Sequence, residues 1–152
     1  MAEMLDEVKA ANLLKEKYLT FFLDEQSFAV DIQYVVEIIG IQGITKIPKV
    51  PDYISGITNL RGKIISIIDM RARFHKMPKA YDKETCIIVL DVNDVTVGLI
   101  VDGVDEVEDI PEGEISNPPH MEWDYSSNFL QGVFQRNGEV RLILDCGKVL
   151  NG

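Results

Sequence analysis

The sequence predicts an all-β protein in which two related units of about five strands follow one another. From Tyr18 onward, short runs rich in β-branched and aromatic residues alternate with Gly, Pro, Asn and Asp. No helical period separates these runs, and such a pattern is typical of antiparallel sandwiches and barrels. The second half of the chain also repeats the first, which assigns one β unit to each half.

Eight runs have the length and composition of strands, and a short helix is expected at each end of the chain. Residues 3–17 have a helix-forming composition without a strong cap, which predicts a short, frayed helix. A last short helix is expected after Asp145. The expected strands are 18–23, 28–32, 35–39, 62–69, 85–90, 95–101, 132–136 and 140–145.

The internal repeat sets the expected domain organisation. Residues 54–74 align without a gap on residues 130–150, and residues 18–32 align on residues 85–99. The offset is 67 residues in the early block and 76 in the late block, so the second half holds nine extra residues. We expect them in the proline-rich stretch 117–128. These alignments predict an N-terminal tail or helix (1–17), a first subdomain (18–80) and a second subdomain (81–152), with a boundary near 76–83. Strands may cross between the subdomains. Overall, the two subdomains form a single domain (18–150).

Composition excludes several classes of function. The 152 residues carry a net charge of −10, which disfavours nucleic acid and anionic lipid because phosphate binding needs clustered Lys and Arg. No apolar run approaches the roughly 18 residues of a membrane span, and the N-terminus lacks a secretory pattern. Cys86 and Cys146 form neither a CxxC pair nor a disulfide framework, which suits a reducing cytoplasm.

Motifs for catalysis, metals and phosphate are missing from the sequence, so no catalytic residue, metal or cofactor is expected. His75 and His120 are isolated, and no His or Cys pair has ligand spacing. Neither a nucleophile-elbow pattern nor a glycine-rich phosphate loop occurs. The repeat aligns Cys86 with Leu19 and Cys146 with Met70, which indicates that both cysteines are small core residues.

Two aspartates occupy equivalent places in the two copies of the repeat. Asp69 and Asp145 each follow a predicted strand. A duplicated acid at equal positions is typical of a turn or cap, where the side chain accepts backbone hydrogen bonds. We therefore interpret this pair as structural and not as half of a catalytic site.

The two copies of the repeat differ in sequence at the tip of one hairpin. Asn137-Gly138 is a strong signal for a type I′ turn, which needs positive φ at both central residues. The first copy places Arg61-Gly62 at these positions, where a long cation costs local energy or forces another turn type. Taken alone, Arg61 is either an ordinary solvated arginine or a residue retained for something other than folding.

Two segments place apolar residues among polar ones. In 33–39, strict alternation would put Val35 and Ile39 beside Glu37 on the wetter face, and Val104 in 102–108 lies among acids. These residues are either scattered surface hydrophobics or, if the two segments lie side by side, an apolar strip that fits an amphipathic helix.

The distribution of charge along the chain is also uneven: residues 61–83 hold seven Lys or Arg, and residues 91–114 hold nine acids.

Taken together, four motifs resemble the CheW family of bacterial chemotaxis coupling proteins. They are GITNLRGKIISIID (56–69), AVDIQYVVEI (29–38), GLIVDGVDEV (98–107) and FLQG (129–132). The resemblance covers residues 18–150. It implies the CheW-like fold of two tandem five-stranded SH3-like barrels, and an adaptor that is monomeric alone and joins the histidine kinase CheA to the cytoplasmic tip of methyl-accepting chemoreceptors.

The resemblance also implies which residues contact the receptor, whereas no motif marks the kinase side. Gly62, Asn137 and Gly138 are expected to serve the turns only. The alternatives are a small-ligand or enzymatic β-barrel, which the lack of a titratable cluster disfavours, and a nucleic-acid binder, which the charge disfavours. The receptor contacts carried over are Val35, Glu37, Gly56, Arg61, Val104 and Val107.

Overall fold

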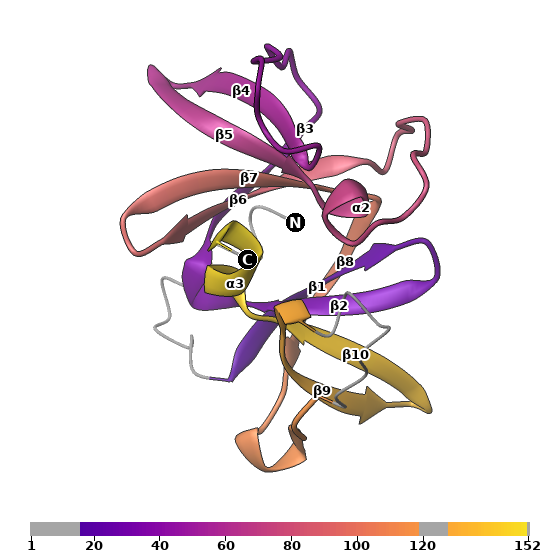
Figure 1. Ribbon diagram of the computed structural model, residues 1–152. Helices are drawn as coiled ribbons and strands as arrows, with labels where there is room; N and C mark the ends of the chain where they lie inside the picture. The colour runs from indigo at the N-terminus through magenta and orange to yellow at the C-terminus, as the bar shows by residue number, and fades with distance from the viewer. Residues whose placement is uncertain (1–15, 119–127, 152) are drawn as a thin grey trace.

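Two five-stranded sheets make up the computed structural model, which describes residues 16–118 and 128–151. Sheet A has the strand order β8-β1-β2-β10-β9, and sheet B has the order β3-β6-β7-β5-β4. Figure 1 shows sheet B above sheet A, with α2 and α3 between them. The predicted all-β class with two SH3-like, barrel-like units is confirmed.

The elements of the described residues run as follows. The strands are β1 (Lys17–Leu23), β2 (Gln26–Asp31), β3 (Val35–Gly40), β4 (Ile54–Leu60), β5 (Lys63–Asp69), β6 (Cys86–Val92), β7 (Val95–Val101), β8 (Gly103–Asp109), β9 (Leu130–Arg136) and β10 (Glu139–Leu144). The short helices are η1 (Ile32–Tyr34), α2 (Met70–Arg73), η2 (Glu112–Glu114) and α3 (Cys146–Asn151).

All eight predicted strands are present, and two further strands were not predicted. β4 contains a glycine and an asparagine, and β8 contains four acids in seven residues, so neither has a strong intrinsic β propensity. Pairing with β5 and β1 holds them as strands. The predicted C-terminal helix is α3. The predicted N-terminal helix and the stretch proposed for the insertion lie largely outside the described residues.

The two halves of the chain exchange strands. The β1–β2 hairpin joins β8, β9 and β10 in sheet A, while β6 and β7 join β3, β4 and β5 in sheet B. The exchange is reciprocal: β3 pairs with β6 as β8 pairs with β1, and β5 runs parallel to β7 as β10 runs parallel to β2. The expected division into 18–80 and 81–152 therefore follows the sequence repeat but not the sheets.

The chain passes between the two sheets at short connections. Only η1 separates β2 from β3, and its cap, Asp31, accepts a hydrogen bond from the backbone N–H of Gln33 at 3.0 Å. This single 3₁₀ turn carries the chain from β2 in sheet A to β3 in sheet B. In the second half, Asp102 alone separates β7 from β8.

Equivalent hydrogen bonds show the repeat in space. The N–H of Asp69 donates to the carbonyl of Tyr53 at 2.8 Å, and the N–H of Asp145 donates to that of Phe129 at 2.8 Å. Asp69 Oδ1 also accepts from the N–H of Ala72 at 3.4 Å, and Asp145 Oδ1 accepts from that of the equivalent residue, Lys148, at 3.1 Å. The predicted structural role of both aspartates is thus confirmed.

The largest hydrophobic core lies between the sheets and takes residues from both. Leu19 and Phe21 of β1 contribute to it together with Leu99 of β7, all of them fully buried. Each such side chain contributes about 1.5–3 kcal/mol on burial. Cys86 and Cys146 also belong to this core, as predicted. Burial raises their thiol pKa values to about 11 and about 12, so both thiols stay protonated at neutral pH.

A buried arginine joins the two copies at the centre of the molecule. The guanidinium of Arg73 lies 3.9 Å from the ring centre of Tyr53 and 4.5 Å from that of Phe129. Arg73 Nε donates to the carbonyl of Val149 in α3 at 2.9 Å. Tyr53 and Phe129 are equivalent in the repeat, as are Arg73 and Val149, so this contact lies where the two halves meet.

Candidate functional site

The hairpin between β4 and β5 has the same turn as the hairpin between β9 and β10. Arg61 and Gly62 have φ values of 53° and 85°, and Asn137 and Gly138 have values of 55° and 80°. Arg61 therefore occupies the asparagine position of a type I′-like turn, as predicted, and does not force another turn type. This left-handed conformation is uncommon for an arginine and favourable for asparagine.

Arg61 reaches from this tip to β3. Both of its terminal nitrogens donate to the carboxylate of Glu37, NH1 to Oε2 and NH2 to Oε1, the latter at 2.6 Å. This hydrogen bonding lowers the pKa of Glu37 and raises that of Arg61. The Arg61 side chain stays 71% exposed, whereas that of Glu37 is 19% exposed. The pair fixes the hairpin to the edge of sheet B and still presents a cation to solvent.

Val35 does not lie on the wetter face, and that prediction is wrong. The residue is 1% exposed and belongs to the central core, while its neighbour Val36 is 45% exposed. A register shift between Val35 and Glu37 in the β3–β6 ladder breaks the strict alternation on which the prediction depended. Ile39 packs against the apolar cluster of sheet B.

Gly56 has a backbone role. It is buried at a bulge in β4 with a φ of 150°, and a Cβ there would lie 2.2 Å from the carbonyl oxygen of Thr45. Thr45 forms a bridge with Ile57, so any side chain at position 56 would push this covering segment off β4. Gly56 thus shapes the strand that leads to the Arg61 turn.

Val104 and Val107 lie on β8, at the edge of sheet A. Both are half-buried and pack against the central core. β3, in contrast, is an edge strand of sheet B, so the two segments do not pair with each other. Because Val35 is buried, it does not contribute to the apolar strip expected from segments 33–39 and 102–108.

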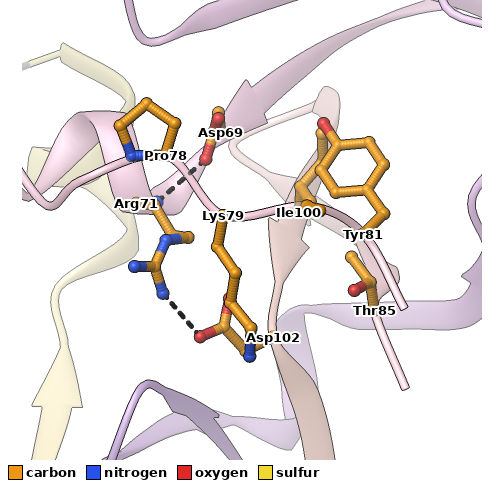
Figure 2. Close-up of a pocket in the computed structure, with 9 residues that line it drawn as sticks. Asp69, Arg71, Pro78, Lys79, Tyr81, Thr85, Ile100 and Asp102 are labelled. Carbon is orange, nitrogen blue, oxygen red and sulfur yellow. Dashed lines mark hydrogen bonds and ion pairs between the residues drawn. The ribbon is translucent and has the colours of Figure 1, made fainter. Parts of the chain in front are cut away.

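A pocket of about 340 Å³ lies beside α2 and was not predicted from the sequence. Figure 2 shows Arg71 donating to Asp102 on one side, with Tyr81 and Thr85 on the other. Arg71 NH1 lies 2.7 Å from carboxylate oxygens of both Asp102 and Asp24. The charge asymmetry of the sequence indicated a basic segment here, but not that this arginine would pair with acids distant in sequence.

The donor set of this region does not favour a metal. Within 16–118 and 128–151, no three His, Cys, Asp or Glu side chains gather in a way that would hold an ion. His75 lines a second pocket with Arg73 and Lys148, and the cationic neighbours there disfavour a metal ion. None of the helices in the same ranges has the length and apolarity to cross a membrane.

The fold is a duplicated, barrel-like β domain. It consists of two SH3-like five-stranded sheets with exchanged strands, and one of its hairpins has an arginine at the tip. The model of the CheW-like domain matches residues 17–152, and the chain belongs to this family.

Curated relatives and a solved structure agree with this assignment. The chain is 33% identical to the chemotaxis protein CheW of Klebsiella aerogenes over 93% of its length and 86% of the relative's. It is 29% identical to the CheW protein of Bacillus subtilis, over 90% and 87%. The crystal structure of the scaffolding protein TtCheW from Thermoanaerobacter tengcongensis superposes with a TM-score of 0.80 at 36% identity, covering 86% of this chain and 88% of that one.

Proposed function

We propose that this protein is a non-catalytic chemotaxis scaffold that couples methyl-accepting chemoreceptors to the histidine kinase CheA. The observation that carries the proposal is the Arg61 turn within a chain of the CheW-like family. Arg61 adopts a backbone conformation suited to asparagine, and its side chain is held by Glu37 while remaining largely exposed. A cation held at an energetic disadvantage for folding suits a role in binding a partner.

The receptor side of the proposal combines this ion pair with exposed or partly exposed valines on β3 and β8. Val36 on β3 is exposed, and it takes the place that alternation had assigned to Val35. Val104 and Val107 offer partly exposed apolar surface on β8. Charged and apolar side chains of this kind fit an amphipathic helix such as a receptor tip. Val35 and Gly56 contribute by shaping β3 and β4.

For the kinase side we propose the first residues of β5 and β7, where β5 follows the Arg61 turn. Ile64 and Val95 are 59% and 56% exposed. β5 and β7 run parallel with Ser66 opposite Val97, so the register places Ile64 beside Val95 on one face. Lys63 lies next to them and donates to Thr96 at 2.7 Å. An apolar centre with a polar rim suits a contact with the CheW-like domain of CheA.

The experiment is co-sedimentation with purified receptor cytoplasmic fragments and CheA. A variant that keeps the turn at position 61 but removes the positive charge tests the role of the charge alone. Arg61→Asn supplies the residue that the second copy uses, so the hairpin keeps its conformation while the cation is lost. We expect this variant to fold as the wild type and to lose receptor binding. Unchanged binding by a folded Arg61→Asn chain would contradict the proposal.

A matched pair of variants tests the kinase side. Ile64→Asp should reduce co-sedimentation of CheA but not of receptor fragments, whereas Val140→Asp, at the equivalent position of β10, serves as the control for an exposed apolar residue of the other sheet.

A small-ligand or enzymatic barrel is not favoured. We place the scaffold in the cytoplasm, recruited to receptor arrays.

A further inference from the structure

The two sheets differ in the chemistry of their equivalent interior positions. In sheet B, Ile65 and Ile87 are buried in one apolar cluster. The repeat aligns Ile65 with Arg141 and Ile87 with Thr20. Arg141 is 7% exposed and Thr20 is fully buried. These two interior positions are thus apolar in sheet B and polar in sheet A, and buried polar groups reduce stability unless they are paired.

A buried ion pair spans the interior of sheet A. Arg141 Nε on β10 lies 3.6 Å from Glu108 Oε2 on β8, and their side chains are 9% and 8% exposed. β1 and β2 lie between these strands in the sheet. Neither of the two atoms has a hydrogen bond within the described residues, although Arg141 NH1 donates to Glu139 at 2.6 Å. The pair thus connects the edge strand β8 to a strand that it does not neighbour.

Thr20 completes the backbone pairing of β8 at a bulge. The β1–β8 ladder shifts register between Leu19 and Phe21, which leaves Thr20 without a partner residue on β8. Its hydroxyl donates to the carbonyl of Glu106 at 2.9 Å and accepts from the N–H of the same residue at 3.1 Å. The Thr20 side chain therefore pairs with both the N–H and the carbonyl of Glu106, which the bulge would otherwise leave without hydrogen bonds.

β8 is an edge strand whose own composition opposes pairing. It pairs with β1 alone, and four of its seven residues are acidic and repel one another. A shift by one residue would exchange the two faces of the strand and carry Val104 and Val107 away from the core. Only the present register sets Glu108 against Arg141 and the backbone of Glu106 against Thr20.

We propose that Thr20, Glu108 and Arg141 are positioning residues that lock the register of β8. Replacing a buried ion pair with apolar side chains is often neutral or stabilising, so the pair is retained for the single arrangement it permits and not for stability. The lock itself is independent of the proposed receptor binding. Its consequence, the correct presentation of Val104 and Val107, rests on that function.

Amide hydrogen exchange on the full chain, followed by mass spectrometry, tests the lock. The readout is the exchange rate of β8 relative to β3, its counterpart in the other sheet. Thr20→Val keeps the shape and removes the hydroxyl, and we expect β8 to exchange about tenfold faster relative to β3. Thr20→Ser keeps the hydroxyl and should exchange at the wild-type rate. Equal ratios in the two variants would overturn the proposal.

The double variant Glu108→Leu/Arg141→Met separates register from stability. It copies the apolar interior of sheet B, so we expect a melting temperature at or above that of the wild type together with faster exchange confined to β8. A wild-type β8 rate, or equal acceleration in both sheets, would overturn the lock because the pair would then act through packing or general stability alone. The Thr20 variants decide the case if the double variant fails to fold.

Discussion

Arg73 donates a hydrogen bond from Nε to the carbonyl of Val149, the residue that occupies its own position in the other half of the repeat. The contact joins α2 to α3, and the guanidinium lies between Tyr53 and Phe129, which are also equivalent. One residue thus breaks the symmetry of the repeat in order to connect its halves. Folding of the whole domain should depend on it.

Arg73→Ala is expected to destabilise the protein by about 3 kcal/mol, because the α3 carbonyls lose a charged donor and two aromatic rings lose their stacking partner. The free energy of unfolding from urea denaturation measures the loss. Arg73→Lys keeps the charge but not the planar group, so it should recover only part of the stability. Wild-type stability in Arg73→Ala would show that the contact contributes nothing.

Acid should release the Arg61 tip. The pKa of Glu37 is lowered in the folded protein, so its ionised form stabilises the fold above the ordinary glutamate pKa of 4.5. This contribution is lost as pH falls through the lowered value. The difference in unfolding free energy between wild type and Glu37→Gln should therefore be constant near neutral pH and shrink below about pH 4. A difference that grows with acidity would contradict the ion pair.

Adjacent valines on β3 should respond in opposite ways to the same substitution. Val35→Asp buries a carboxylate in the central core and should unfold the protein or cost at least about 3 kcal/mol. Val36→Asp changes an exposed side chain, so stability should stay within about 0.5 kcal/mol. Thermal unfolding of the two variants measures this contrast. Tolerance of aspartate at both positions would place Val35 outside the core.

Two glycines with positive φ should differ in the cost of an added methyl group. Gly56→Ala meets the Thr45 carbonyl and should cost more than about 2 kcal/mol. Gly62→Ala meets nothing within 4 Å, so only its φ of 85° opposes it, at about 1 kcal/mol. Denaturant unfolding compares the two. Equal costs would mean that the close approach of Thr45 has no energetic weight.

The sequence predicts those features of the fold and site that depend on local chemistry. Asn137-Gly138 requires a particular turn, and the ungapped repeat transfers that turn to Arg61-Gly62 with φ values that agree within a few degrees. The paired roles of Asp69 and Asp145 follow in the same way. Both inferences concern backbone groups within a few residues of the side chain, where residue type largely decides geometry.

What the sequence does not predict depends on contacts between distant segments. A repeat shows that two units are equivalent, but the pattern is the same whether β3 pairs within its own half or with the other. Val35 lies on the opposite side from the one predicted because the β3–β6 ladder contains a bulge. Alternation along one strand carries no trace of such a shift, and the pairing of Arg71 with Asp102 is equally long-range.

The exchange of strands makes the two halves an obligate pair. A cut in the connection 76–83 would leave two fragments, each holding the central hairpin that the other fragment's sheet requires. Neither fragment alone could complete a five-stranded sheet, yet mixing them would restore both sheets at once. Each sheet depends on both copies of the repeat, so loss of either copy would disrupt both sheets together.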